Sequence, residues 1–395
     1  MEEDKDTRMA RFSIATPVWQ PGVQPPRHFW YLPRISTLVV MQFFLFLLSP
    51  LCMSLALPMA AQPTPPLGRP VYRNLVMEGG GIRGIAYGGA LQELEARGVL
   101  VGLRRVGGTS AGAIQAALLA VGYSPQEIIA VINQTPVQQL NDGRLMFFGG
   151  STRLLKQYGW YRGDEFTRYL SRLVARKTQQ PNLTLGQLHN LAQQHPTRYR
   201  DLYTTGTNLT TQRVQVFSYE TNPDMRVADA VRISMSIPLY FRAVLLNQQG
   251  QVVQRPVKGQ PVEVLVDGGL LANFPITLFD HPRYLPSSGA PTAPSSVNPE
   301  TLGLRLDRAE QIALDTLPDG RQRLAPYAIH DIGSYVGALY NVAIENLNPA
   351  QPSDWPRTIS ISTRGFNPKI KRMSAAQKQE LVDSGQQGAQ AFFRR

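Results

Sequence analysis

Residues 103–120, LRRVGGTSAGAIQAALLA, decide the fold. Their first part predicts a buried strand that ends at Val106, and their last part predicts an apolar helix from Ala113 to Leu119. The G-x-S-x-G turn Gly108-Thr109-Ser110-Ala111-Gly112 joins them and places Ser110 at a sharp bend, at the N-terminus of the helix. Because backbone N–H groups there favour negative charge, Ser110 is a candidate nucleophile. A glycine-rich loop capped by a serine is the alternative that this turn leaves open.

A second glycine turn lies upstream of the first. Leu75 to Met77 predict a short strand, Glu78 to Gly84 (EGGGIRG) a loop, and a helix follows from Ile85 to a stop at Gly98. Such a loop lets backbone N–H groups converge on an anion. Its spacing matches neither a Walker loop nor a dinucleotide fingerprint, so an oxyanion formed at Ser110 fits better than a phosphate. A simple tight turn is the alternative.

A third stretch, Val264 to Gly269 (VLVDGG), ends an apolar run with an acid and two glycines. An ionised carboxylate at the end of a buried strand is costly unless it is paired, so Asp267 is a candidate for a catalytic role. A structural aspartate that caps a turn is the alternative.

In this order and at these separations, the three motifs resemble those of the patatin-like phospholipase family. The resemblance covers about residues 72–279 and extends more weakly to the C-terminus, with support from residues 228–238 and 273–275. It implies an α/β fold of three layers, with a mostly parallel central sheet flanked by helices. One departure is Glu78, where the family more often has Asp or a small polar residue.

The same resemblance implies an activity and a set of site residues. It implies a hydrolase of carboxylic ester bonds in lipids or phospholipids, with no cofactor. Ser110 would be the nucleophile and Asp267 the base of a Ser–Asp dyad. Gly80, Gly81 and Arg83 would belong to the oxyanion loop.

Two other interpretations of the motifs stay open. One is a Ser-Asp-His triad in which His281 or His330, which both follow Asp267, is the base. The other is a catalytically idle, membrane-associated interaction protein on the same scaffold. A metal site is not expected, since His189 and His195 lack an acidic or thiol partner in step and the chain has no acidic calcium loop.

Composition limits the partners. The 395 residues, 43% of them hydrophobic, can bury one large α/β core or at most two domains. A formal charge of +12 suits an anionic surface, either phospholipid or nucleic acid. Because the chain contains no nucleic-acid-binding module, we expect an anionic membrane surface as the partner rather than nucleic acid. A scattered basic surface without a partner is the alternative, and the oligomeric state stays open.

The N-terminal part differs in character from the rest. Residues 1–36 predict an unstructured leader, and residues 37–61 a signal peptide or an uncleaved membrane anchor, so that we expect an exported protein. Residues 62–71 form a proline-rich linker. Residues 72–395 form the patatin-like domain, with a mobile insertion at residues 282–299 that is rich in proline, serine and alanine.

Capping and alternation patterns predict further elements. Ser124, Pro125 and Glu127 indicate the start of a helix that runs to about Asn133. Further helices are expected at residues 164–175 and 374–393, and strands at 202–207, 213–219, 302–306 and 359–361. The aromatic stretches 145–148 and 158–161 either wall an acyl-chain pocket or belong to the ordinary core.

Overall fold

The computed structural model describes residues 71–135, 140–142, 154–155, 157–286, 297–317, 323–331, 334–335, 338–339, 342, 351–366 and 373–395. The chain divides into two units, Met1–Pro63 and Thr64–Arg395. All described residues belong to the second unit. The predicted leader, the apolar segment at 37–61 and most of the predicted linker lie outside the described residues.

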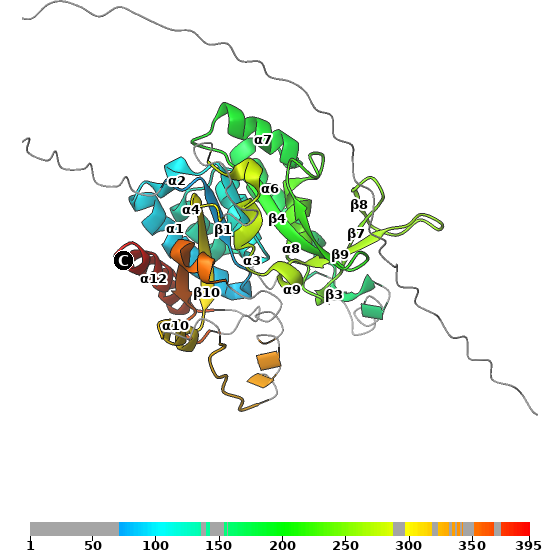
Figure 1. Cartoon of the computed structure of the whole chain (residues 1–395). Coiled ribbons are helices and arrows are strands. Elements are labelled where there is room, and N and C mark those ends of the chain that lie inside the picture. Colours follow the sequence, from blue (N-terminus) through cyan, green and yellow to red (C-terminus); the bar gives the residue numbers. More distant parts are fainter. Residues whose placement is uncertain are drawn as a thin grey trace, which may run out of the picture. The chain divides into compact units, whose positions relative to one another are not determined.

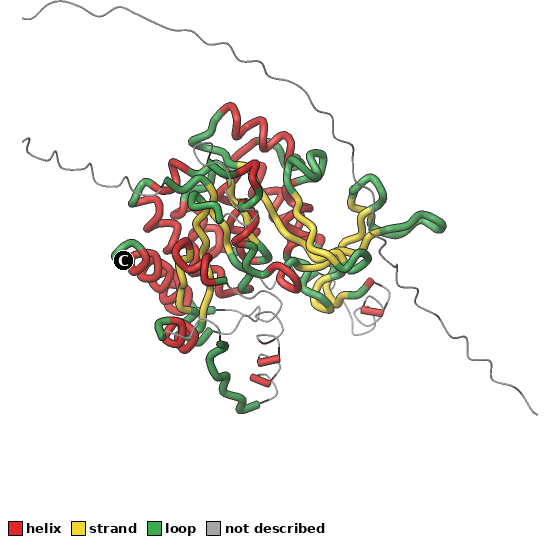
Figure 2. The backbone as a smooth tube through the Cα atoms, viewed as in Figure 1, coloured by secondary structure: helices red, strands yellow, loops and turns green. Residues whose placement is uncertain are grey.

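In the described part of the chain, nine strands form one sheet (Figures 1 and 2), in the order β11-β10-β1-β2-β4-β9-β7-β8 with β5 beside β4. The strands of this sheet are β1 (Asn74–Met77), β2 (Arg105–Gly108), β4 (Asp201–Asn208), β5 (Arg213–Phe217), β7 (Val244–Leu246), β8 (Val252–Val253), β9 (Glu263–Asp267), β10 (Thr301–Asp307) and β11 (Thr358–Ser362). The five from β11 to β4 pair in parallel, and β5, β7, β8 and β9 pair antiparallel. A second sheet joins β3 (Gly159–Tyr161) to β6 (Leu239–Phe241).

The helices connect and cover these strands. The α-helices are α1 (Tyr87–Ala96), α2 (Val99–Gly102), α3 (Ala111–Ala120), α4 (Pro125–Gln134), α6 (Asp164–Thr178), α7 (Leu185–Gln194), α8 (Val227–Ser234), α9 (Gly269–Ala272), α10 (Ala309–Asp315) and α12 (Ala375–Phe392). The 3-10 helices are η1 (Gly81–Ala86), η2 (Ile276–Phe279), η3 (Pro282–Tyr284) and η5 (Pro352–Arg357). The predicted cap of α4 is present, since Ser124 Oγ accepts from Glu127 N at 3.2 Å and the Glu127 carboxylate accepts from Ser124 N at 2.9 Å.

Strand β1 shows why both faces of the sheet are covered. Its side chains alternate, so Leu75 and Met77 enter the large core that also contains residues of α1, α3, α6, α8 and α12. Val76 points the other way, into a smaller cluster with Tyr203 of β4, Phe279 of η2 and Tyr284 of η3. A sheet with a core on each face has three layers, and the predicted α/β fold with a mostly parallel sheet flanked by helices is confirmed.

Helices α1 and α12 touch backbone to backbone (Figure 1). A Cβ atom built on Gly89 would lie 1.8 Å from the Val382 carbonyl oxygen, and one built on Gly385 would lie 1.8 Å from the Ala86 carbonyl oxygen. Only glycine fits at either position, so the C-terminal helix is positioned by two glycines that the sequence pattern did not single out.

We therefore expect Gly385→Ala to lower the free energy of unfolding, although the same change in an open helix raises helix stability. Overpacking of this kind costs about 1–3 kcal/mol. Chemical unfolding followed by circular dichroism would measure it. Glu380→Ala, on an exposed part of the same helix, is the matched control. Equal stability of the two variants would contradict the close approach of the helices.

One element differs from its prediction. The helix expected from Ile85 is preceded by η1, because the glycine loop coils into a 3-10 turn at Gly81 before α1 begins. The mobile insertion at 282–299 stays a prediction; near its ends Tyr284 and Asn298 are buried, and Asn298 Nδ2 donates to the carbonyl oxygens of Phe279 and Tyr284 at 2.9 Å each. Residues 287–296 lie outside the described residues.

The predicted localisation is corrected. A helix needs about 20 consecutive apolar residues to cross a bilayer. Within the ranges that the structure describes, no helix reaches the length and hydropathy that a membrane span requires. Residues 37–61, the basis of the export prediction, lie outside these ranges, so the structure gives no positive sign of an export segment and the prediction is withdrawn.

Candidate active site

Ser110 lies at the sharp turn between β2 and α3. Its backbone has φ 51° and ψ −117°, a region that non-glycine residues rarely adopt. Gly108 and Gly112 allow this turn to pass against the end of β1, because a Cβ atom on either would lie 2.6 or 2.2 Å from the Met77 carbonyl oxygen. The structure therefore shows why both glycines of the G-x-S-x-G pattern are needed.

Hydrogen bonds from other elements hold the turn in place. The Ser110 N–H donates to Ser234 Oγ, at the end of α8, over 3.0 Å. The Thr109 hydroxyl lies 2.6 Å from Thr205 Oγ1 and donates to the Ala272 carbonyl oxygen at 2.7 Å. The strained backbone of Ser110 is thus stabilised by β4, α8 and α9 together.

Asp267 lies at the end of β9, and its carboxylate lies close enough to the Ser110 side chain for that hydroxyl to lower the pKa of Asp267. Asp267 Oδ1 also accepts from Gly269 N at 2.7 Å, and Asp267 N donates to the Ser236 carbonyl oxygen at 2.9 Å. Ser110 is 8% and Asp267 6% exposed. The fold therefore joins two predicted site residues that are 157 positions apart in the sequence.

Burial controls the acidity of this carboxyl group. Desolvation raises the pKa of Asp267 from its ordinary 3.8 to about 7, while the hydrogen bonds from Gly269 N–H and Ser110 act in the opposite direction. At neutral pH the group is close to half ionised. Such a carboxylate is a much stronger base than an exposed aspartate.

The glycine loop passes directly over Ser110. A Cβ atom on Gly79 would lie 3.3 Å from Ser110 Cβ and 2.4 Å from Asn273 Oδ1, so no larger residue fits there. Gly81, with φ 57°, lines the same cavity as Ser110. The Gly80 N–H has no hydrogen-bond acceptor among the residues that the structure describes. The loop thus brings at least one available backbone donor close to the serine.

Arg83 braces this loop. Its Nε donates to the Gly80 carbonyl oxygen at 3.1 Å. This bond orients the peptide that follows Gly80, which carries the Gly81 N–H. The structure therefore places all three predicted loop residues, Gly80, Gly81 and Arg83, in one turn of chain beside Ser110.

Glu78 and Asn273 complete the site, and the sequence analysis gave them no role in it. Asn273 Nδ2 donates to Glu78 Oε1 at 3.0 Å and to the Gly79 carbonyl oxygen at 3.3 Å. Glu78 Oε2 accepts from the Leu306 N–H at 2.7 Å. Both side chains are buried, and together they tie the glycine loop to α9 and β10. Glu78 stood out only as a departure from the family pattern, which was the available signal.

Ser110 opens into a cavity of about 830 Å³ with largely apolar walls. The walls come from η1, α3, α6 and the segment from α8 to β6, and their apolar side chains include Ile82, Ile85, Ile114, Leu118, Phe166, Leu170, Leu173, Met235, Ile237 and Phe241. A cavity of this size and lining suits one hydrocarbon chain.

Of the two predicted aromatic walls, the stretch 158–161 does not line this cavity. Residues 145–148 lie outside the described residues. In the stretch 158–161, Tyr158 lines a different cavity, Trp160 is 37% exposed, and Tyr161 packs against Tyr240 with ring centroids 4.9 Å apart. The acyl-sized cavity is built instead mostly from aliphatic residues, with Phe166, Tyr169 and Phe241 as its aromatic residues.

The histidines lie elsewhere. His281 and His330 are exposed, and His281 Nδ1 accepts from Arg283 N at the start of η3. His189 pairs with Asp201 at 2.8 Å and stacks on Tyr219. In the described ranges, no hydrogen bond joins a histidine to the Ser110–Asp267 pair, and no group of three or more His, Cys, Asp or Glu side chains could hold a metal ion.

Comparison with known families agrees with this geometry. Residues 75–280, just over half of the chain, match the model of the family described as patatin-like phospholipase. The chain therefore belongs to the patatin-like phospholipase family, which is a family of lipid hydrolases.

Individual relatives support this placement. YqhO, an uncharacterised protein of Bacillus subtilis, is 36% identical over 233 residues, which are 57% of this chain and 72% of that protein. A probable lipid hydrolase of Invertebrate iridescent virus 6 is 26% identical over 211 residues, 52% of this chain and 63% of the viral one. VipD from Legionella pneumophila has the same fold, with a TM-score of 0.53 and 18% identity over 82% of this chain and 67% of VipD.

Proposed function

We propose that this protein is a serine-dependent lipid acyl hydrolase that cleaves carboxylic ester bonds of phospholipids or lysophospholipids through Ser110 and Asp267. The observation that carries the proposal is the buried Ser110–Asp267 pair, whose serine lines an apolar cavity of about 830 Å³. Membership of a lipid hydrolase family supports the substrate class.

In the first half of the reaction, Ser110 Oγ attacks the ester carbonyl carbon while Asp267 accepts the hydroxyl proton. The resulting oxyanion accepts hydrogen bonds from the N–H groups of Gly80 and Gly81, and Arg83 keeps the loop in position. When the tetrahedral intermediate collapses, the proton on Asp267 passes to the leaving alcohol. The acyl group stays on Ser110.

In the second half, water attacks the acyl ester and gives a proton to Asp267. The second tetrahedral intermediate uses the same N–H groups, and its collapse returns the proton to Ser110 Oγ and releases the fatty acid. Each such backbone donor is worth about 3–4 kcal/mol of transition-state stabilisation. The N-terminus of α3, which begins at Ala111, adds a favourable dipole.

Lipid binding has two separate sources in this proposal. The aliphatic cavity takes the acyl chain, because each buried CH₂ group contributes about 0.8 kcal/mol. The net charge of +12 attracts the protein to an anionic membrane surface, where the substrate is found.

An active-site label tests the proposal. We expect a fluorophosphonate carrying an alkyl chain to form one covalent adduct on the folded chain, located at Ser110 by peptide mass spectrometry, and Ser110→Ala to remove it. The reagent requires an activated serine, so a folded protein that forms no adduct would favour the catalytically idle scaffold. An adduct at another serine would contradict the assignment of the nucleophile.

A further inference from the structure

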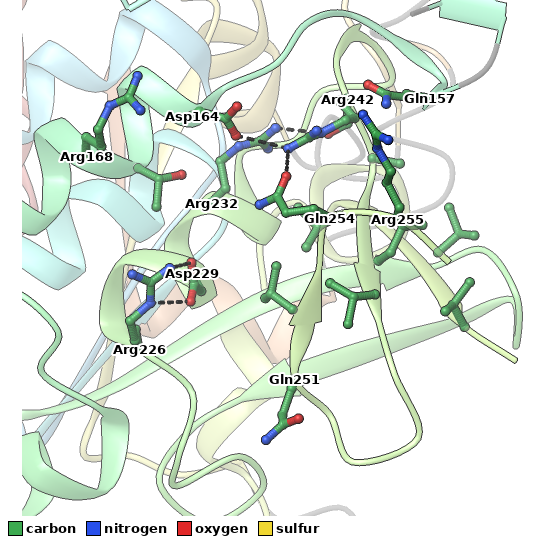
Figure 3. A pocket seen from close by; sticks show the side chains of 18 of the residues that line it. Gln157, Asp164, Arg168, Arg226, Asp229, Arg232, Arg242, Gln251, Gln254 and Arg255 are labelled. Atoms are coloured by element: carbon green, nitrogen blue, oxygen red, sulfur yellow. Dashed lines mark hydrogen bonds and ion pairs between the residues drawn. The ribbon is translucent and has the colours of Figure 1, made fainter. Parts of the chain in front are cut away.

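A second cavity, of about 1310 Å³, lies outside the proposed catalytic site (Figure 3). Helix α6 separates the two: Phe166 and Leu170 line the catalytic cavity, whereas Thr167 and Ser171 line the second one. The other walls of the second cavity come from α8, from strands β7, β8 and β9 with the residues that flank them, and from Gln157, Tyr158 and Asn182. No step of the proposed reaction uses them.

The charged residues in this wall are predominantly basic. Six arginines line the cavity, against two aspartates: Arg168, Arg172, Arg226, Arg232, Arg242 and Arg255, with Asp164 and Asp229. Three of the arginines are paired with carboxylates, namely Arg226 with Asp229 (2.7 Å), Arg242 with Asp164 (3.0 Å) and Arg168 with Glu165 on its own helix. The other three, Arg172, Arg232 and Arg255, have no ion pair with any carboxylate that the structure describes.

Arg232 is the most informative of these three, because it is only 5% exposed. Its guanidinium donates to the carbonyl oxygens of Arg162 (2.8 Å) and Arg242 (2.9 Å) and to Ser236 Oγ, all of them neutral acceptors. Burial lowers the pKa of Arg232 to about 10, so it still carries its charge at neutral pH. A buried cation without a carboxylate partner is costly unless an anion reaches it.

The arginines are placed so that they can act together. Arg242 Nη2 donates to Gln254 Oε1 at 2.8 Å. Because Gln254 precedes Arg255 in the chain, this hydrogen bond holds Arg255 near Arg242, whose carbonyl oxygen accepts from Arg232. Figure 3 shows the side chains of Arg232, Arg242 and Arg255 at one end of the cavity, apart from the Arg226–Asp229 pair.

Part of the remaining wall is aliphatic, beside polar side chains that include Thr167, Ser171 and Asn182. Val244 and Leu245 of β7 and Val252 and Val253 of β8 belong to the aliphatic part. A cationic end next to an aliphatic wall suits an anion that carries a phosphate group, with or without an acyl chain, since guanidinium groups match phosphate oxygens in a bidentate geometry.

We propose that this second cavity binds a phosphate-bearing anion, held at its basic end by Arg232, Arg242 and Arg255. The anion supplies a direct partner for Arg232, on which Asp142, Asp164 and Asp229 act only from a distance that forms no ion pair. Two sources share this chemistry, a soluble phosphate ester and the headgroup of an anionic lipid. Binding at this site does not depend on the Ser110–Asp267 reaction, so it can be tested separately.

The test compares two probes on the full chain. Binding of glycerol 3-phosphate is measured by calorimetry, and binding to vesicles by co-sedimentation with phosphatidylcholine alone and with phosphatidylcholine containing phosphatidic acid. Binding of glycerol 3-phosphate identifies a soluble ester as a sufficient ligand. Binding only to the phosphatidic acid vesicles identifies the lipid headgroup. If neither probe binds, the proposal is overturned.

Variants locate the site. Arg255 is exposed and has no ion pair in the described part of the chain, so Arg255→Gln is expected to fold as the unsubstituted protein does. Whichever of the two probes binds the unsubstituted protein should bind this variant about tenfold more weakly, which is the effect of one lost charge-assisted contact. Arg213→Gln, which removes the same charge from an exposed position on β5, is the matched control and should bind as the parent does. If both variants weaken binding equally, attraction is nonspecific and the proposal is wrong. If Arg255→Gln binds like the parent, the basic end of the cavity is not the site.

Should Arg255→Gln fail to fold, Arg242→Gln, which also removes a charge from the basic end, takes its place with the same expected tenfold loss. Thermal unfolding without any anion verifies the fold of each variant. Unchanged binding by a folded Arg242→Gln chain would also overturn the proposal.

Discussion

Asp267→Asn is expected to lower kcat for ester hydrolysis by about 10⁴-fold, the usual loss when the residue that supports a catalytic serine is neutralised. The amide keeps the size of the carboxylate and can still accept a hydrogen bond from Gly269 N–H. It cannot take the proton of Ser110, so the hydroxyl stays a poor nucleophile. Initial rates on a soluble short-chain ester measure the effect without a membrane.

The same variant should keep its fold. The pKa of Asp267 is raised from 3.8 to about 7 on folding, so the folded state binds more protons than the unfolded state between these values, and stability falls as the pH rises through this window. Asparagine removes that loss, and we expect Asp267→Asn to unfold at the same or a higher temperature than the parent above pH 7. Asp201→Asn is the control at another buried aspartate, paired with His189, and should keep its turnover. A folded Asp267→Asn chain that retains more than a few per cent of the parental rate would remove Asp267 from the mechanism.

In the unsubstituted protein, the dependence of kcat/KM on pH is expected to report the titration of Asp267. Because the ionised form of Asp267 is the proposed base, we expect kcat/KM to rise about tenfold per pH unit below pH 7 and to level off above it. An aspartate of ordinary acidity would give a flat profile from pH 5 upward. Rates between pH 5 and pH 9 distinguish the two cases. A flat profile would mean that Asp267 is solvated during turnover, or that another group accepts the proton.

The elements that local chemistry controls could be predicted from the sequence. Ser124, Pro125 and Glu127 begin α4 as expected, because all the atoms of a capping box lie within four residues. The sharp turn at Ser110 was predictable for a similar reason, since its two glycines stand at fixed distances on either side. The family motifs then indicated that Asp267 and the glycine loop belong to the same site.

Other parts of the site could not be predicted, because they depend on contacts between distant segments. Ser234 Oγ accepts a hydrogen bond from the Ser110 N–H, and Asn273 bonds both Glu78 and the glycine loop at Gly79. No local pattern in the sequence assigns those partners. The walls of the catalytic cavity come from helices whose apolar stripes read as ordinary core. The paired strands that bring Arg242 and Gln254 together likewise lie outside any motif.

The sequence by itself determined the sharp turn at Ser110, the capped start of α4 and the family, since these follow from neighbouring residues and motif spacing. Only the tertiary structure decided that the Asp267 carboxylate is buried against Ser110 with a pKa of about 7, and that Arg232 lies buried without a carboxylate partner in the described part of the chain. The physical reason is that the desolvation of a group depends on which distant segments cover it, and its charge pairing on which side chains they bring beside it. The packing of the sheet and its helices determines both.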